Sequence, residues 1–255
     1  MLGTSEGKTA MPVKQAAQVV ELLELFARLG RPASLAEVTM QLGWPRSSAF
    51  KLLGTLVDLG CLYEPRSRGG YFPTTRWLEL GQAFEVAQPV PPALLEALAE
   101  VARRTGETTV IAAPAGLAAV FLHVAESRHA VRYAAAVGKR VPIHATATGR
   151  ALLSLYAPAE RAALLGKVRF ERYTRATLTT VAAVEADIEA SVARGWFESA
   201  GGFTPDLGGV ALPVRLDGRR YALLVAGPVG RVSGGHASLA RAISTAFETH
   251  LGAFA

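Results

Sequence analysis

A short stretch near the N-terminus combines basic and hydroxyl side chains at a spacing suited to nucleic-acid contact. Its members are Arg46, Ser47, Ser48, Lys51 and Thr55, and a following turn rich in glycine and proline carries Arg66 and Arg68. Guanidinium and ammonium groups bind phosphates, and small residues at the start of a helix allow it to approach base edges closely. The sequence therefore predicts a surface that contacts double-stranded DNA.

Three helices and a hairpin are expected to position these side chains. Apolar residues recur at helical spacing from Lys14 to Leu29, and Gly30 can end that helix. The second helix begins with a capping-box pattern, in which the Ser34 hydroxyl accepts from the Glu37 amide and the Glu37 carboxylate returns to the Ser34 amide. Pro45 suits the start of the third helix, and its buried stripe comprises Ala49, Leu52, Leu53 and Leu56. Strand-like runs at 61–63 and 71–72 complete a winged helix-turn-helix.

The rest of the chain has the pattern of a second, larger domain. A helical stretch from Thr75 is interrupted by the proline-rich segment 88–92, which we interpret as a hinge. Beyond it, strands are expected at 108–113, 119–124, 131–137, 209–214 and 221–226, and helices near 93–105, 147–156, 158–166, 181–194 and 236–251. The predicted fold is α+β, with a tail at 1–12, a winged helix-turn-helix at 13–75, a linker helix at 76–92 and an effector-binding domain at 93–255.

Composition narrows the class of protein. The chain has 255 residues and a formal charge of +6, which favours an anionic partner. Residues 46–76 hold five Lys and Arg against two Asp and Glu, whereas residues 1–81 hold nine against seven, so positive charge is concentrated at the predicted contact surface. One cysteine and five widely spaced histidines predict no disulfide, metal site or cofactor. No long apolar run or signal-peptide pattern is present, so we expect a cytoplasmic protein with no membrane partner.

Two segments resemble the IclR family of bacterial transcriptional regulators. Residues 33–81 contain its Gly-x-Pro-[Arg/Lys]-Ser helix start at Gly43 and its Leu-x-x-Leu-x-x-x-Gly close at Gly60. Residues 137–153 are similar to the family's Gly-x-x-x-Pro-[Leu/Met]-His segment, and 194–197, 210–214 and 226–228 match later landmarks. The resemblance implies a GAF-like effector domain, a small organic effector, and self-association as a homodimer or a dimer of dimers.

The resemblance also places effector-binding positions, and here the sequence departs from the family pattern. Tyr133, Ala147 and Thr148 fall where the family's pocket is lined. Acid-binding members carry an Asp, a Cys and two Ser in the later strands, but the matching positions here are a shortened 203–207 segment ending at Leu207, then Gly209, Leu224 and Ala226. Such a pocket suits an aromatic or apolar compound, with Asp206 as a candidate replacement acid. From the residues alone, the loop before Thr148 is either an acid-binding helix start or a simple cap and tight turn.

These observations favour a ligand-responsive one-component regulator that is not an enzyme. Two other classes stay open: an enzyme with an appended winged helix, and a protein-interaction module. An enzyme would need a paired acid and base or a nucleophile with its base, and no such pair is evident. An interaction module would bind duplex DNA without salt dependence or not at all. A helical bundle with solvated arginines is the simplest structural alternative. Whether control is repression or activation depends on operator position, which the chain does not encode.

Overall fold

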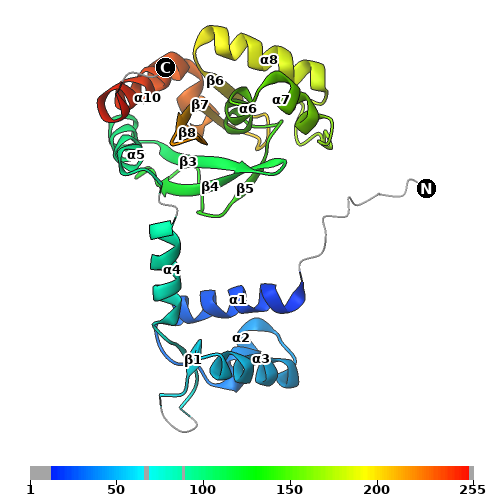
Figure 1. The fold of residues 1–255 in the computed structure, drawn as a ribbon, viewed down its shortest axis with the longest axis vertical. Coiled ribbons are helices and arrows are strands. Elements are labelled where there is room, and N and C mark those ends of the chain that lie inside the picture. The colour runs from blue at the N-terminus through cyan, green and yellow to red at the C-terminus, as the bar shows by residue number, and fades with distance from the viewer. Residues whose placement is uncertain (1–12, 66–68, 88–89, 253–255) are drawn as a thin grey trace, which may run out of the picture. The chain divides into compact units, whose positions relative to one another are not determined.

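The computed structural model describes residues 13–65, 69–87 and 90–252 (Figure 1). The chain divides into two compact units, with the boundary between Pro89 and Val90. We call them the first and second units and describe each by itself. The predicted tail at 1–12 and the hairpin arginines Arg66 and Arg68 lie outside the described residues.

The first unit contains four helices and a two-stranded hairpin. These are α1 (Lys14–Leu29), α2 (Leu35–Leu42), α3 (Arg46–Asp58), β1 (Leu62–Tyr63), β2 (Phe72–Pro73) and α4 (Arg76–Ala87). The apolar stripes expected on α1 and α3 meet in one core, which includes Leu22, Leu25, Phe26, Val38, Leu53 and Leu62. Helices α1 and α2 end at Gly30 and Gly43, as the glycine positions predict. The first three helices therefore agree with the predicted winged helix-turn-helix.

The start of α2 differs in one detail from its predicted capping box. The Ser34 hydroxyl accepts a hydrogen bond from the Glu37 amide at 3.2 Å, as expected. The Glu37 carboxylate, however, accepts two hydrogen bonds from the Arg31 guanidinium, at 3.0 and 2.7 Å. The Arg31 hydrogen bond is the main cause of the lowered pKa of Glu37, ahead of the Ser34 backbone. The principal partner of this carboxylate therefore lies outside the capping-box motif.

The hairpin connects α3 to α4. Its two strands pair in antiparallel register, Leu62 with Pro73 and Tyr63 with Phe72. The Trp77 indole donates to the Cys61 carbonyl at 2.9 Å, and the Thr74 hydroxyl donates to the Gly60 carbonyl at 2.7 Å. These bonds attach the first turn of α4 to the base of the hairpin.

The second unit is built on a six-stranded antiparallel sheet. Its strands are β3 (Thr108–Ala115), β4 (Ala118–Ala125), β5 (Arg140–Pro142), β6 (Phe197–Ala200), β7 (Leu207–Leu216) and β8 (Arg219–Pro228), in the order β5-β4-β3-β8-β7-β6. Its helices are α5 (Pro92–Thr105), α6 (Ala147–Ser154), α7 (Pro158–Leu165), α8 (Val181–Arg194), α9 (Val229–Val232) and α10 (His236–Leu251). The α+β prediction for this region is confirmed.

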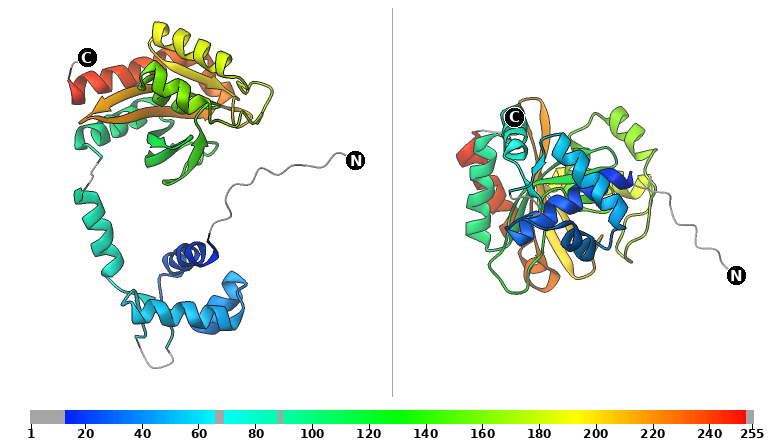
Figure 2. Two further views of the ribbon diagram at one scale, coloured as in Figure 1. Left: turned by 45° about the vertical axis from the view of Figure 1, so that its right-hand side comes forward. Right: turned by 90° about the horizontal axis from the view of Figure 1, so that it is seen from below.

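Helices cover both faces of this sheet (Figures 1 and 2). Helices α5 and α10 pack side by side on one face, and α6 packs on the other against β7, β8 and α8. Alternation along β8 directs Leu224 and Ala226 to the α6 side and Leu223 and Val225 to the α5 and α10 side. Successive side chains of a strand point to opposite faces of the sheet, so only every second residue can line a site beside α6.

One predicted strand is wrong, and three elements, β5, β6 and α9, were not predicted. Residues 131–137 form a loop, and β4, which pairs with β3 on one side, pairs on its other side with the later segment β5. Side chains occupy two carbonyls of that loop: the Thr108 hydroxyl donates to Tyr133 O at 2.7 Å, and Arg231 donates to Val131 O at 3.0 Å. A backbone bound in this way does not pair with β4. The short strands β5 and β6 and the single-turn helix α9 lack the length that makes a periodic pattern visible.

Three further features bear on the predicted class of protein. No helix among the described residues is long and apolar enough to cross a membrane. The same residues contain no group of three or more His, Cys, Asp or Glu side chains placed to hold a metal ion. Cys61 is a free thiol buried in the core of the first unit.

Candidate DNA-contacting surface and ligand cavity

The first turn of α3 presents the predicted contact residues to solvent. The helix starts directly after Pro45, whose carbonyl accepts the first intrahelical bond from Ala49 at 3.0 Å. Ala49 is fully buried, whereas Arg46, Ser47 and Ser48 are exposed. The buried alanine holds this turn against the core, so the three polar side chains project from a fixed backbone.

Lys51 and Thr55 continue the exposed face along α3. The Thr55 hydroxyl donates to the Lys51 carbonyl at 2.8 Å, so its proton is used within the helix and only its lone pairs are free to accept. Among the described residues, neither Arg46 nor Lys51 has an ion-pair partner, and both cations are available to a phosphate. The structure therefore brings all five predicted α3 residues to the surface, with Thr55 the most restricted of them.

An aromatic residue on the same helix was missed by the sequence analysis. Phe50 lies between Ala49 and Lys51, and 59% of its surface is exposed. The search for contact residues considered only polar and small side chains, and a phenylalanine on an amphipathic helix is ordinarily a core residue. The sequence did offer one signal for this residue, because Phe50 lies off the buried stripe of α3.

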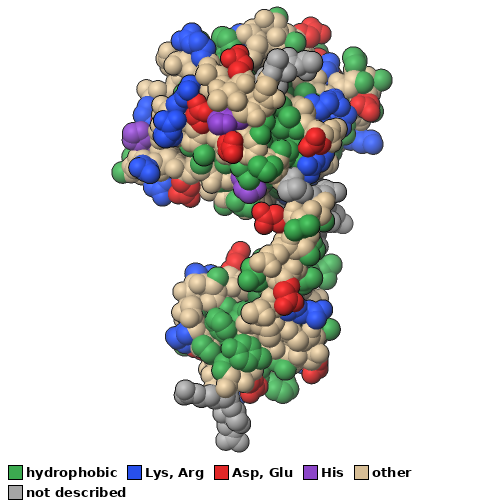
Figure 3. All heavy atoms as spheres, turned by 60° about the vertical axis from the view of Figure 1, so that its left-hand side comes forward, with side chains coloured by type: hydrophobic (Ala, Val, Ile, Leu, Met, Phe, Trp, Pro, Cys, Tyr) green, Lys and Arg blue, Asp and Glu red, His purple; other side chains and the backbone are tan. Residues whose placement is uncertain are grey.

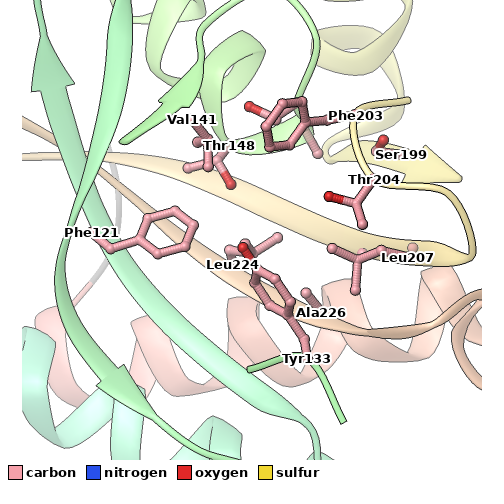
Figure 4. A pocket seen from close by; sticks show the side chains of 14 residues that line it. Phe121, Tyr133, Val141, Thr148, Ser199, Phe203, Thr204, Leu207, Leu224 and Ala226 are labelled. Atoms are coloured by element: carbon pink, nitrogen blue, oxygen red, sulfur yellow. The ribbon is translucent and has the colours of Figure 1, made fainter. Parts of the chain in front are cut away.

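A cavity lies between the sheet and the start of α6 in the second unit (Figure 4). Its volume is about 50 Å³, several times the roughly 10–15 Å³ that one enclosed water needs. All seven predicted effector positions line it: Tyr133, Ala147, Thr148, Leu207, Gly209, Leu224 and Ala226. The other lining residues are Phe121, Val141, Thr146, Ser199, Phe203, Thr204 and Gly208. The structure thus gathers lining residues from five strands, two loops and the start of α6.

The walls of the cavity are apolar, and its few polar groups are uncharged. None of its described lining residues carries a charged side chain, and the aromatic rings of Phe121, Tyr133 and Phe203 face it (Figure 4). The polar side-chain groups of its lining residues are the hydroxyls of Thr146, Thr148, Ser199 and Thr204 and the Tyr133 phenol. This composition can enclose an aromatic ring and hydrogen-bond a small polar substituent.

The start of α6 adds backbone donors to this cavity. Thr146 caps the helix: its hydroxyl accepts from Gly149 N at 3.1 Å and donates to Pro142 O at 3.0 Å. The amides of Ala147 and Thr148 have no acceptor among the described residues, and both residues line the cavity. Gly149 is required here, because a Cβ at this position would lie 2.1 Å from the Ile143 carbonyl oxygen. The loop before Thr148 is therefore a cap and tight turn, and it leaves two amides without an acceptor among the described residues.

Tyr133 is held in the cavity wall by several contacts. Its carbonyl accepts from the Thr108 hydroxyl, its ring meets the Phe121 ring edge-on at 6.4 Å, and the Lys139 ammonium lies 4.9 Å from the ring centre. The same loop is fixed by Arg231, which pairs with the buried Glu107 carboxylate. A loop that lacks regular structure is thus given a defined conformation around a lining residue.

The structure overturns one expectation about polar groups, at Asp206, and explains another, at Gly209. Asp206 does not line the cavity; its side chain is exposed, and its carbonyl accepts from Val229 N at 2.7 Å. The expectation that Asp206 replaces the missing acid is therefore wrong. At Gly209 a Cβ would lie 2.6 Å from the Val225 carbonyl oxygen, so close pairing of β7 with β8 excludes any side chain there. The absence of a polar group at this position follows from packing.

Phe203 packs against a partly buried aromatic cluster. The Tyr173 ring contacts it edge-on at 4.8 Å, and His144 in turn lies 6.0 Å from Tyr173 and 5.2 Å from Phe170. His144 is buried, and its Nε2 lies 3.3 Å from the Glu171 carbonyl oxygen. Burial is the main cause that lowers the pKa of His144, and the charge of Arg150 lowers it further. Neutral His144 is thus the form that the fold favours.

Arg150 ties the helix that bears the free amides to its surroundings. It is buried, and its guanidinium donates to Asp187 on α8 at 2.5 Å and to the carbonyls of Glu198 and His144 at 2.6 and 3.4 Å. Burial lowers the pKa of Arg150, and the Asp187 carboxylate opposes that effect. A charge in this position holds α6, α8 and β6 together beneath the cavity.

Four of the larger lining residues were missed from the sequence, whereas Phe203 and Thr204 lie in the 203–207 segment that the resemblance matched to the pocket. The four are Phe121, Val141, Thr146 and Ser199. Phe121 and Val141 belong to β4 and β5, whose pairing was not foreseen. Ser199 belongs to the unpredicted β6. The alternation in residues 119–124 was the one local signal that could have selected Phe121.

Comparison with known proteins assigns both units. A family model described as IclR helix-turn-helix domain matches residues 16–65, and one described as bacterial transcriptional regulator IclR C-terminal matches residues 87–249. The HTH-type transcriptional regulator BhcR of Paracoccus denitrificans (strain Pd 1222) is 29% identical over 241 residues, which cover 91% of this chain and 82% of that protein.

Solved structures agree with this result. The Thermotoga maritima IclR structure matches with a TM-score of 0.72 at 17% identity, and covers 94% of this chain and 99% of its own. An IclR homolog from Microbacterium hydrocarbonoxydans, complexed with 4-hydroxybenzoate, matches with a TM-score of 0.68 at 25% identity. That match covers 93% of this chain and 98% of the homolog. The Thermotoga maritima match shows a shared fold. The Microbacterium hydrocarbonoxydans homolog was solved with an aromatic ligand bound.

Proposed function

The chain belongs to the IclR family of transcriptional regulators, and we propose that it acts as a ligand-responsive one-component regulator. A dimer, or a dimer of dimers, binds a pseudopalindromic operator through the winged helix-turn-helix at 13–75. Residues 76–92 act as the linker, and residues 93–255 bind a small aromatic or apolar effector. The effector controls transcription because it has different affinities for the DNA-binding and the non-binding arrangement of the dimer. The protein acts in the cytoplasm and does not transform its effector.

The proposal for DNA contact is supported by the surface of α3. Arg46, Ser47, Ser48 and Lys51 are exposed together on a helix whose opposite face is buried. In this class of fold, the third helix enters the major groove and the hairpin approaches the flanking backbone. Arg66 and Arg68 are proposed as phosphate or minor-groove contacts from the hairpin tip. Thr55 is proposed as a weaker acceptor, because its proton is already used.

The proposal for self-association is supported by α4. No residue of this helix is buried, and its exposed apolar side chains include Phe84 at 69% and Val86 at 82%. Apolar side chains are also open at the surface of the first unit in Figure 3. A twelve-residue helix with several uncovered apolar side chains favours a partner surface, and a second copy supplies the symmetry that a pseudopalindromic operator requires.

The proposal for the effector class rests on the cavity beside α6. Three aromatic rings and Leu207, Leu224 and Ala226 can surround an aromatic ring, and the free amides of Ala147 and Thr148 can hold one carboxylate or hydroxyl. The related chain that is complexed with 4-hydroxybenzoate supports a ligand of this kind. Short polar acids such as glyoxylate would leave the aromatic walls without a partner.

A ligand panel tests the effector class with the full-length protein. We expect 4-hydroxybenzoate, benzoate and neutral benzoate esters to raise the midpoint of thermal unfolding more than glyoxylate or pyruvate at equal concentration, because a ligand stabilises the folded state that binds it. Calorimetry then measures affinity, and chromatography of the incubated ligand detects turnover. If only short polar acids bind, the proposed effector class is wrong; chemical conversion would instead favour an enzyme.

A binding-site selection tests DNA recognition. Random duplexes bound by the full-length protein are enriched and sequenced, and the resulting duplex is titrated with wild type and with Ser47→Ala and Lys51→Ala variants. Loss of Lys51 is expected to weaken binding and to reduce the slope of log K against log salt by about 0.9 per contact. Undiminished binding by the triple variant of Ser47, Lys51 and Arg66 to alanine would count against this surface.

A further inference from the structure

The exposed ring of Phe50 on α3 is not explained by the fold. Its neighbour Ala49 is fully buried, and the core stripe continues through Leu53 and Leu56. Phe50 lies off that stripe, with 59% of its surface exposed. Isolated exposed apolar residues are common, so exposure alone decides nothing. The position of Phe50 among the proposed DNA contacts is what distinguishes it.

Helical geometry places this ring on the contact surface. At about 100° per residue, Arg46 and Gly54 lie roughly 40° from Phe50 around the helix axis, and Ser47 lies roughly 60° away. Arg46 is one turn before it and Gly54 one turn after it. The Phe50 ring therefore lies between the Arg46 side chain and Gly54, which has no side chain. Ser47 lies on the same exposed side of the helix.

Gly54 leaves space beside the ring. It lies in the interior of α3, where glycine destabilises a helix relative to alanine. A Cβ at this position would meet no heavy atom within 4 Å, so nothing in the described chain requires glycine there. The space beside Phe50 is open to another molecule that approaches α3 closely.

The approaching molecule proposed above is duplex DNA, and its major groove exposes one prominent apolar group. That group is the 5-methyl of thymine, which apolar side chains recognise by contact, whereas the other base edges offer hydrogen-bond donors and acceptors. Building on the proposed function, we propose that Phe50 contacts a thymine methyl group in each half of the operator. The ring is thereby a specificity-determining residue that favours A·T at one position per half-site.

A double-mutant cycle between protein and DNA tests this contact. The duplex selected by the full-length wild type is remade with each thymine replaced singly by uracil, which removes only the methyl group. Wild type and Phe50→Ala are titrated against every duplex. We expect one thymine per half-site at which uracil weakens wild-type binding roughly fourfold, the effect of losing one buried apolar carbon. Phe50→Ala should bind the thymine and uracil duplexes equally.

Two further variants keep the test specific. Met40→Ala removes another exposed apolar side chain, 73% exposed on α2, and should retain the full response to uracil. Phe50→Leu keeps an apolar side chain and should retain part of that response. Circular dichroism and light scattering check folding and self-association of each variant.

Each outcome separates this inference from the function on which it rests. If the wild type selects no sequence, the proposed operator binding fails. If it selects a sequence but wild type and Phe50→Ala respond equally to uracil at every position, operator binding stands and the thymine contact is overturned. If Phe50→Ala keeps the uracil response and loses self-association, the ring belongs to a protein contact and the inference is likewise overturned.

Discussion

The surface of α3 and the cavity beside α6 are assembled in opposite ways. The α3 residues follow one another within a single helix and point to solvent, while the core holds the other face of that helix. The cavity residues come from positions between 121 and 226; five of the fourteen belong to the core of the second unit, and three more pack against it. The first site needs one well-packed helix, whereas the second needs the whole sheet to be correctly paired.

This difference predicts how far function and stability can be separated. Substitution of an exposed α3 residue removes a contact and leaves its neighbours unchanged, so DNA binding can be altered with little effect on folding. Substitution around the cavity changes packing as well as ligand contact, since side chains there already fill a dense interior. Three changes in the second unit test how strongly its ligand site and its stability are linked.

The largest effect is expected from Arg150→Met. The substitution removes a buried guanidinium that bonds Asp187 and two backbone carbonyls, and should cost about 3–5 kcal/mol of unfolding free energy, because its partners stay behind unpaired. Denaturant titration of the full-length protein, followed by circular dichroism, measures the change. Arg132→Met removes an exposed ion pair with Glu126 and serves as the control, with little expected change. Equal effects of both variants would contradict the bracing role of Arg150.

The next effect is expected from Ala226→Leu, which fills the cavity from β8. The larger side chain should weaken binding of an aromatic effector at least tenfold, or about 1.4 kcal/mol, by occupying its space. Calorimetry measures the affinity, and titration of the selected duplex shows whether operator binding persists without a response to effector. Ala222→Val on the same face of β8 but outside the cavity lining is the matched control for overpacking. Unchanged effector affinity in Ala226→Leu would place the binding site elsewhere.

The smallest effect is expected from the pH dependence associated with His144. Because its pKa in the folded state is lowered from 6.5, its contribution to stability is fully present above pH 6.5 and is lost as pH falls through the folded-state value. Denaturation at a series of pH values below 7.5 should show a smaller acid-side loss of stability for His144→Gln than for wild type. Gln keeps a donor for the Glu171 carbonyl but cannot become charged. Parallel curves for the two proteins would show that protonation of His144 is not linked to unfolding.

Sequence patterns predicted the first unit well because its elements are local. Helix α1 runs over the predicted residues, and the buried stripe of α3 includes Ala49, Leu53 and Leu56. Such patterns depend on neighbours three and four residues away. These local patterns could not show that Arg31 would bind Glu37. The capping motif does not include a long side chain from a residue that precedes the helix.

Patterns in the second unit were less informative because pairing there is long-range. Residues 131–137 have a strand-like composition but form a loop held by Thr108 and Arg231. Family resemblance did place seven lining positions in one cavity, but it offered Asp206 as a polar group that the fold leaves outside. The orientation of each side chain followed from strand register, which no short window of sequence contains.

The sequence by itself determined the helices of the first unit and the row of small and basic residues that opens α3, because caps, glycine stops and helical periodicity act within a few residues. Only the tertiary structure decided the chemistry of the cavity. The order β3-β8-β7-β6 brings Leu224, Ala226 and Ser199 toward α6, and the closeness of β7 to β8 excludes a side chain at Gly209. The exposed position of Phe50 was likewise settled by packing, since a helix of this amphipathicity could have buried that ring.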